Sequence, residues 1–216
     1  MKNKIIFYTL WLLLLSLGPI VVFKNTPSVD LIMKNPTVMF NVVQRIVGLS
    51  AFTLLFVQII LGSFMTKLAT RFGGWIFSFH IFEGILIYGL IILHPTLFVI
   101  FNYFAGHGID PFYVFTEVCV LCRNRFELFY TLGRVSFWLI SISVFAGLFR
   151  TATPWLRVNW KKLHVINFLS FILISIHSIG VGTDIGTFPF SFFHGPAIAI
   201  ISGIIVYKLY KYFKWS

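Results

Sequence analysis

The sequence predicts an all-α integral membrane protein, a six-helix bundle with both termini in the cytoplasm. Of its 216 residues, 58% are hydrophobic and only 11% are charged, and the mean hydropathy is +0.93. Soluble domains carry about 25% charged residues, so this chain cannot cover a water-exposed surface with polar side chains. At about 20 apolar residues for each span, the chain accommodates six helices and little else.

Six apolar segments form the candidate spans, and turns rich in glycine and proline separate them. The first begins after Met1-Lys-Asn-Lys and continues for 19 residues to Phe23. The apolar core of a signal peptide has about 7–15 residues, so this longer segment is interpreted as a span. Residues 1–216 form a single domain with spans near 5–23, 38–65, 75–104, 128–149, 163–182 and 195–213.

Basic residues gather on one side of this arrangement. The side that holds both termini carries eleven bases and no acid, whereas the other side carries six bases and five of the six acids. Because positive residues stay on the cytoplasmic side, both termini are predicted to be cytoplasmic, in the cell (inner or plasma) membrane. The net charge of +11 is therefore an orientation signal, and no nucleic-acid partner is expected.

Four histidines lie in or at the ends of two spans. His80 and His94 belong to the third span, and His164 and His177 belong to the fifth. An ionisable side chain inside a span is costly and indicates a functional site by default. A single histidine is more often a hydrogen-bonded helix contact, but two on each of two helices form a pattern.

The spacing arranges these histidines in two tiers. His80 and His94 are 14 residues apart, which is about 21 Å along a helix, and they face the same side to within about 40°. His80 with His164 forms an inner tier, and His94 with His177 forms an outer tier. Each tier offers two imidazoles, the ligand set of six-coordinate haem iron. We expect two b haems with these histidines as axial ligands, and electron transfer at the haem edge.

The spacing of 13 residues between His164 and His177 fits a straight helix badly. It rotates the two side chains about 220° apart. A kink, a local change of winding or laterally offset haems would reconcile them, and the sequence does not choose among these.

The histidine pattern, with two flanking segments, resembles a known family. The matching residues are His80-x13-His94, His164-x12-His177, Trp160-Lys161-Lys162-Leu163-His164, and a span from Leu132-Gly133-Arg134 to Gly147-Leu148-Phe149-Arg150. They resemble the ferric reductase-like transmembrane domain of NADPH oxidases, ferric reductases and the haem-binding membrane subunit of bacterial periplasmic methionine sulfoxide reductase. The 14/13 spacing matches the oxidase and ferric reductase branches. The resemblance covers nearly the whole chain and implies two b haems with electron flow from inside to outside.

The sequence also departs from that family. Complete enzymes continue into FAD- and NADPH-binding domains, whereas this chain has no glycine-rich dinucleotide fingerprint. Electrons are therefore expected from a separate donor: a cytoplasmic flavoprotein with FAD or FMN, free reduced flavin, or a membrane quinol with its quinone. The oxidase branch has a further histidine four residues after the outer ligand of the third span. Here that position is Phe98, which argues against dedicated superoxide production.

Haem propionates need cationic partners near the membrane surfaces, and arginine binds a carboxylate bidentately. Arg45 and Arg134 are the candidates at the outer tier. The alternative for most of the basic residues is anchoring at the interface by snorkelling. The candidates at the inner tier are Arg71, Arg150, Lys161 and Lys162.

Glu83 is the only acid well inside a span, one turn after His80. It can orient an imidazole, carry a proton or pair with a base. The alternative is a protonated or hydrogen-bonded helix contact. The sequence leaves both open.

Cys119-Val-Leu-Cys122 lies in the outer loop. In an oxidising compartment this pair forms a structural disulfide. The alternatives are a redox relay that receives electrons from the outer haem, free thiols, or a metal site with His107 as the nearest further ligand. His107 and His194 are otherwise interpreted as surface residues.

The predicted protein is an oxidoreductase or electron-transport subunit of the cytochrome b type, surrounded by membrane lipid. It carries electrons from the cytoplasmic donor to an extracytoplasmic acceptor, which is ferric iron, oxygen or a partner reductase. Two alternatives remain: a membrane thiol–disulfide oxidoreductase that uses the Cys119/Cys122 pair with quinone, and a haem-free transporter or assembly subunit. The scarcity of buried acids weakens the transporter interpretation.

Overall fold

The computed structural model of the chain describes residues 2–26 and 28–215, without the side chains of residues 2, 212 and 215. Throughout this part of the chain the regular structure is helical, with no strand. Six segments of the described chain are long and apolar enough to cross a membrane, which confirms the predicted all-α six-helix bundle. The chain is an integral, multi-pass membrane protein that associates with lipid.

Five of the spans in the described chain are single helices, and one consists of two. The single helices are α1 (Lys2–Lys24), α3 (Pro36–Ser63), α5 (Trp75–Phe104), α7 (Arg125–Leu148) and α10 (Phe190–Trp215). Between α7 and α10, the helices α8 (Pro154–His164) and α9 (Asn167–Val181) follow each other to form the remaining span.

Caps and prolines set the ends of two spans. The side chain of Asn35 accepts a hydrogen bond from the backbone N–H of Val38, and the side chain of Thr153 accepts one from that of Leu156. A proline follows each cap, where its missing N–H would have no helical partner in any case. This is why α8 begins at Pro154, well before the predicted start at 163. Inside α5, by contrast, the helix continues through Pro95.

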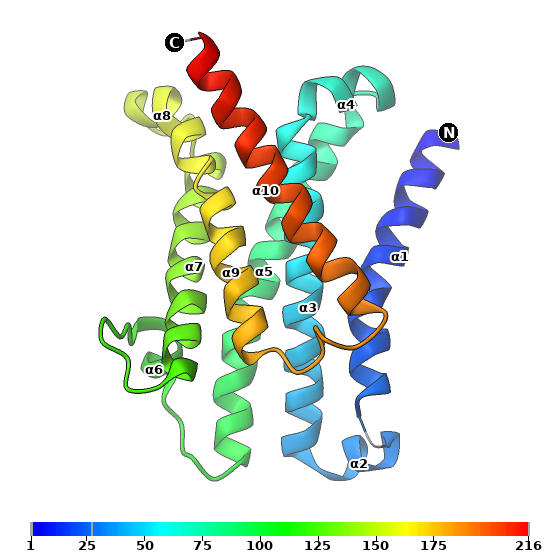
Figure 1. Cartoon of the computed structure of the whole chain (residues 1–216), viewed down its shortest axis with the longest axis vertical. Coiled ribbons are helices and arrows are strands. Elements are labelled where there is room, and N and C mark those ends of the chain that lie inside the picture. Colours follow the sequence, from blue (N-terminus) through cyan, green and yellow to red (C-terminus); the bar gives the residue numbers. More distant parts are fainter. Residues whose placement is uncertain (1, 27, 216) are drawn as a thin grey trace.

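The two ends of the bundle differ in the short helices and charges that they carry. Both termini lie at one end together with α4 (Met65–Phe72) and α8, whereas α2 (Val29–Lys34) and α6 (Pro111–Thr116) lie toward the other end (Figure 1). We call the first of these the basic end. Its exposed bases on the two short helices are Lys67, Arg71, Arg157, Lys161 and Lys162.

Helix α3 forms the centre of the bundle. It packs along α5 and also contacts α1, α9 and α10, while α7 packs along α9. Phe52 of α3 packs against Phe171 of α9, with ring centroids 5.1 Å apart. The outward faces expose large apolar side chains such as Leu12, Phe82 and Ile179, as expected where the surrounding solvent is lipid. Three of the four histidines of interest lie on these helices, His80 and His94 on α5 and His177 on α9, and His164 is the last residue of α8.

Candidate functional site

The two histidines of the outer tier line one cavity. His94 on α5 and His177 on α9 share the wall of a space of about 410 Å³, to which Arg45 and Arg134 also contribute. Ligand and cofactor pockets range from about 300 to 1,000 Å³. The cavity is therefore large enough for part or all of a cofactor held between two helices.

The two histidines of the inner tier lie close together, one on α5 and one at the end of α8. The ring centroids of His80 and His164 are 6.2 Å apart. Two metal–nitrogen bonds of about 2 Å each, with roughly 1 Å from each nitrogen to its ring centre, give about 6 Å. The separation therefore suits two imidazoles on opposite sides of one metal ion. Trp160 packs beside this pair, 5.9 Å from the ring of His164.

Both histidines of α5 lie against glycines of α3. A Cβ atom added to Gly48 would lie 2.6 Å from Cε1 of His94, and one added to Gly62 would lie 3.2 Å from Cε1 of His80. Because glycine has no side chain, the imidazole can approach the helix backbone directly. These two glycines are 14 residues apart, as are the two histidines that they contact.

The same arrangement recurs between α7 and the span formed by α8 and α9. A Cβ atom added to Gly133 would lie 2.8 Å from Nδ1 of His177, and one added to Gly147 would lie 3.5 Å from Nδ1 of His164. Gly133 and Gly147 are also 14 residues apart. All four candidate ligands are thus seated on glycines of a neighbouring helix.

Backbone carbonyls lie beside Nδ1 of three of these rings and fix the position of the proton on two of them, His94 and His177. Nδ1 of His94 donates to the carbonyl of Gln44 over 3.0 Å, and Nδ1 of His177 donates to that of Phe129 over 2.8 Å. A carbonyl can only accept, so Nε2 of each ring keeps its free lone pair. Metal-binding histidines are commonly oriented by this kind of hydrogen bond.

The ring of His164 is held in the same way. Its Nδ1 lies 3.2 Å from the carbonyl oxygen of Ser143 and equally far from the hydroxyl of the same residue. Ser143 precedes Gly147 by four residues, and the carbonyl four residues before the glycine is also the acceptor for His94 and His177. Because the glycine has no Cβ, the carbonyl of the preceding helical turn is accessible to the imidazole. The same arrangement occurs at three of the four rings.

His80 is the exception. Its Nδ1 is buried and has no hydrogen-bond partner among the described residues. The carbonyl of His80 instead accepts a hydrogen bond of 2.8 Å from the side-chain amide of Gln58, four residues before Gly62. An unpaired buried imidazole nitrogen is rare in a folded protein, and His80 lacks the hydrogen bond that orients the other three rings.

A local change of winding lies within the 13-residue spacing and reduces the misalignment of the two histidines. Val165 and Ile166 lie between α8 and α9, and the backbone N–H groups of Ile166 and Phe168 donate to carbonyls three residues earlier, not four. Such a 3₁₀ turn rotates by about 120° per residue, compared with about 100° in an α-helix. The tighter turn rotates His164 toward the side of the span that carries His177.

Arg45 faces the outer cavity and is ion-paired with Asp184. Its Nε donates to Oδ2 of Asp184 over 2.7 Å, and its Nη2 pairs with the other carboxylate oxygen. Asn25 also donates to Asp184, over 2.8 Å. Burial opposes ionisation of this carboxyl, but the hydrogen bonds from Arg45 and Asn25 outweigh it and lower the pKa of Asp184 below its ordinary value.

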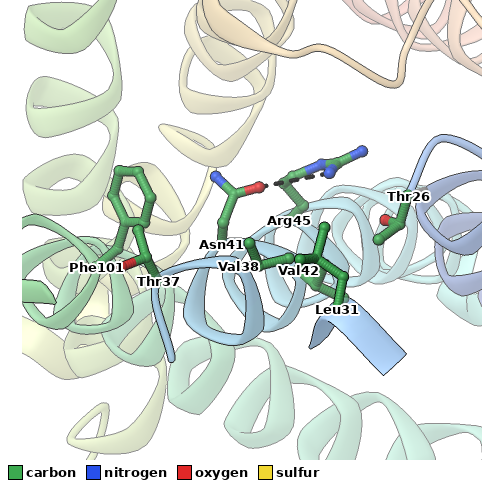
Figure 2. A pocket seen from close by; sticks show the side chains of 8 residues that line it. All are labelled: Thr26, Leu31, Thr37, Val38, Asn41, Val42, Arg45 and Phe101. Carbon is green, nitrogen blue, oxygen red and sulfur yellow. Dashed lines mark hydrogen bonds between the residues drawn. The ribbon is translucent and has the colours of Figure 1, made fainter. Parts of the chain in front are cut away.

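A second cavity, of about 260 Å³, lies beside Arg45. Figure 2 shows the side chain of Asn41 next to that of Arg45, joined by a hydrogen bond of 3.4 Å, with Thr37 and Phe101 to one side of them. Asn41, Arg45 and Phe101 line both cavities. Arg45 therefore stands at the boundary between the histidine cavity and this smaller one.

Arg134 is buried and anchors α6 to the outer cavity. Its guanidinium lies over the ring of Tyr113 at 4.3 Å, donates to the carbonyl of Glu117 and lies 3.8 Å from the carboxylate of Glu127. The hydroxyl of Tyr113 donates to Glu127 over 2.7 Å. Burial, followed by the hydrogen bond to Glu127, raises the pKa of Tyr113.

Glu83 is fully buried and connects two spans. Its Oε1 accepts a hydrogen bond of 2.7 Å from the indole of Trp11 on α1, while its Oε2 has no partner among the described residues. This arrangement corresponds to a hydrogen-bonded helix contact and not to the orientation of an imidazole. The role of Glu83 as a proton carrier stays a prediction.

Of the four bases expected at the inner tier, Arg150 contacts a residue that seats a candidate ligand. Its Nη1 donates over 3.3 Å to the carbonyl of Gly147, on which the ring of His164 rests. The other three, Arg71, Lys161 and Lys162, are exposed at the basic end.

Cys119 and Cys122 form a disulfide, with their Cα atoms 5.3 Å apart. In this structure neither cysteine is a free thiol. Within the part of the chain that the structure describes, no group of three or more His, Cys, Asp or Glu residues could hold a metal ion, and His107 is exposed.

The interpretation of His194 as a surface residue is wrong. This side chain is only 6% exposed, because its ring stacks on Phe52 of α3 and its Nε2 is hydrogen-bonded to the hydroxyl of Ser178 over 2.8 Å. It also lines the outer cavity. The sequence missed it because position 194 lies at the predicted edge of the last span.

No protein-family model, curated protein or solved structure matches the chain. The similarity to the ferric reductase-like family therefore rests on the residues quoted above.

Proposed function

We propose that this protein conducts electrons across a cell membrane through two b haems, each held between two histidines. His80 and His164 hold the inner haem, and His94 and His177 hold the outer one. When bound, the haem iron supplies one-electron chemistry by alternating between its ferric and ferrous states. The remaining steps belong to the side chains of the protein.

The observation that carries this proposal is the repeated seating of the four imidazoles. Each lies on a glycine of the adjacent helix, and three have Nδ1 within hydrogen-bond distance of the carbonyl four residues before that glycine. That bond fixes the ring and leaves Nε2 as the ligand atom. A set of ordinary helix contacts would not need the same geometry at positions that match in spacing on two pairs of helices.

The arginines at the outer cavity supply positive charge where haem propionates would end. Arg45 and Arg134 both line this cavity, and each guanidinium has five N–H donors. Some of the N–H donors of Arg45 bind Asp184, and one N–H donor of Arg134 binds the carbonyl of Glu117. Donors remain on both side chains for a propionate carboxylate.

The charge of the two ends supports an orientation in the membrane, and the proposed direction of electron flow follows from that orientation. The basic end faces the cytoplasm, in keeping with the positive-inside rule. There a flavoprotein, free reduced flavin or a quinol delivers electrons to the inner pair. If His94 and His177 both bound the iron of an outer haem, an extracytoplasmic acceptor such as ferric iron or a partner reductase would take up electrons without binding that iron.

The proposal is tested with His94→Leu in vesicles that contain trapped ferricyanide and receive dithionite outside. The variant should bind about one haem per chain, and reduction of the trapped ferricyanide should slow at least tenfold. His107→Leu is the matched control, because His107 is exposed, and it should behave as the unmodified protein does. Equal loss in both variants, or no loss in His94→Leu, would refute the assignment.

A further inference from the structure

The disulfide between Cys119 and Cys122 closes a small exposed loop between α6 and α7. The two residues inside the ring, Val120 and Leu121, are 92% and 93% exposed. The segment projects from the side of the bundle next to the first turns of α7 (Figure 1). The two cysteines themselves are half-buried, next to these exposed residues.

The same loop is attached to the helix that seats His177. The backbone N–H of Cys119 donates to the hydroxyl of Thr131 over 3.2 Å. Thr131 lies between Phe129, whose carbonyl holds the His177 ring, and Gly133, on which that ring rests. Residues two positions apart point to opposite sides of a helix, so roughly one helix diameter, about 10 Å, separates the disulfide from the imidazole.

A second attachment joins the loop to the outer cavity. The guanidinium of Arg134, which lines that cavity, donates to the carbonyl of Glu117, two residues before Cys119. Tyr113 and Val114 of α6 line the cavity as well. The first turn of α6 therefore belongs to the cavity wall, and the hydrogen bond from Arg134 connects that wall to the segment that leads to the disulfide.

As a structural cross-link alone, this disulfide would add little to the stability of the fold. A disulfide stabilises mainly by closing a long loop in the unfolded chain, and here the two cysteines are only three positions apart. The C-x-x-C spacing is instead typical of cysteine pairs that change their redox state. The hydrogen bonds of Thr131 and Arg134 already hold this segment in place.

We infer that the Cys119–Cys122 disulfide is the electron exit of the protein and is reduced from the outer histidine pair. This inference rests on the proposed function. The S–S bond accepts two electrons from the reduced b haems and two protons from water at the exposed loop, and it breaks to give two thiols. Two haems hold one electron each, so one fully loaded chain carries the two electrons that one disulfide requires.

The resulting dithiol passes its electrons to a disulfide of an extracytoplasmic partner protein. One thiolate attacks the partner disulfide, and the second cysteine resolves the mixed disulfide. The Cys119–Cys122 bond is restored, and the partner is left with two thiols. The exposed Val120 and Leu121 lie at the point where such a partner would approach.

The test is a single turnover without oxygen. The haem-loaded protein receives one equivalent of dithionite, which supplies two electrons per chain, and is then mixed with N-ethylmaleimide, which traps the thiols. The haem spectrum should return to the oxidised form while each chain gains two adducts by intact mass. The chain has only two cysteines, so every adduct reports on this pair, and protein that was never reduced should gain none.

Two variants separate the possible causes. In Cys119→Ser/Cys122→Ser the haems should stay reduced, and in His94→Leu treated identically no adducts should form. Adducts in His94→Leu equal to those of the unmodified protein would show that dithionite reduces the bond directly and would overturn the inference. In the unmodified protein alone, adducts should increase with the fraction of haem that was reduced. Haems that remain reduced without adducts would overturn this inference but not the proposed function, whereas absence of haem would overturn both.

Discussion

At the scale of single residues, the glycines determine how closely an imidazole can approach its neighbouring helix. The space is tightest at Gly48 and Gly133, where an added Cβ would lie 2.6 and 2.8 Å from the histidine ring. It is larger at Gly62, at 3.2 Å, and ordinary at Gly147, at 3.5 Å. The outer pair should therefore be more sensitive to an added methyl group than the inner pair.

Gly48→Ala and Gly133→Ala should each displace the ring that they contact and lower the haem content from two to about one per chain. Gly147→Ala should keep both haems. Gly89→Ala is the matched control, since an added Cβ there has no heavy atom within 4 Å. Haem content is measured as the pyridine haemochrome, and an equal content in all four variants would contradict the proposed role of the glycines.

The sequence revealed the histidines but not what holds them. Ionisable side chains in apolar runs are conspicuous, so His80 and His177 could be recognised without a structure. The role of Gly133 depends on which helices pack together, and no local pattern shows that. The available signal was the 14-residue spacing of glycines in α3 and α7, equal to that of His80 and His94.

At the scale of elements, the break between α8 and α9 sets the relative direction of His164 and His177. The sequence raised the difficulty of a 13-residue spacing, but it could not show that the helix tightens at Val165 and Ile166. Winding depends on how Trp160 and its neighbours pack at the basic end, and this is a tertiary effect.

Insertion of one alanine between Val165 and Ile166 should remove the inner haem and keep the outer one. It rotates His164 by about 100° relative to α9, away from His80. The matched control is an alanine inserted between Thr151 and Ala152, in an exposed turn before α8, which leaves the spacing unchanged and should keep both haems. Reduced-minus-oxidised spectra distinguish the two results, and two haems in both proteins would contradict the prediction.

A second feature at this scale is the segment between α9 and α10, which is tied across the end of the bundle. Asp184 binds Arg45 of α3 and Asn25 after α1, while Lys24 donates to the carbonyl of Phe188 over 3.2 Å. The segment between α9 and α10 thereby contacts two further spans, α1 and α3, beside the outer cavity. The sequence placed Asp184 outside the membrane but gave no sign of its partners.

Asp184→Asn should lower the free energy of unfolding at pH 7 by about 1–3 kcal/mol, because it removes a buried charged hydrogen-bond partner. The pKa of Asp184 is lowered in the folded state from its ordinary 3.8. Its stabilising contribution is therefore complete above that ordinary value and is lost as the pH falls through the lower, folded-state value. Apparent melting temperatures of the unmodified protein and the variant should converge at low pH.

Asp30→Asn is the control for that comparison. Asp30 pairs with Lys34 over 2.9 Å, but both side chains are more than 70% exposed, and exposed ion pairs contribute little. This variant should melt as the unmodified protein does. A loss as large as that in Asp184→Asn would show that any acid at this end of the bundle has the same effect.

At the scale of the whole molecule, the number of spans follows from composition, because apolar runs of this length have no place in water. The partners of each span do not follow, since every outward face is as apolar as the interior. The structure pairs α3 with α5 and α7 with α9. These pairings place one histidine tier toward each end of the bundle. One end of the molecule is the basic end, and the other carries the loop that the Cys119–Cys122 disulfide closes.

The central claim is that this bundle binds two b haems. The direct measurement is the dithionite-reduced minus oxidised visible spectrum of the purified protein, with haem quantified per chain as the pyridine haemochrome. We predict the spectrum of low-spin b haem and a content of two haems per chain. A colourless protein, or a content of one haem per chain, would contradict the account.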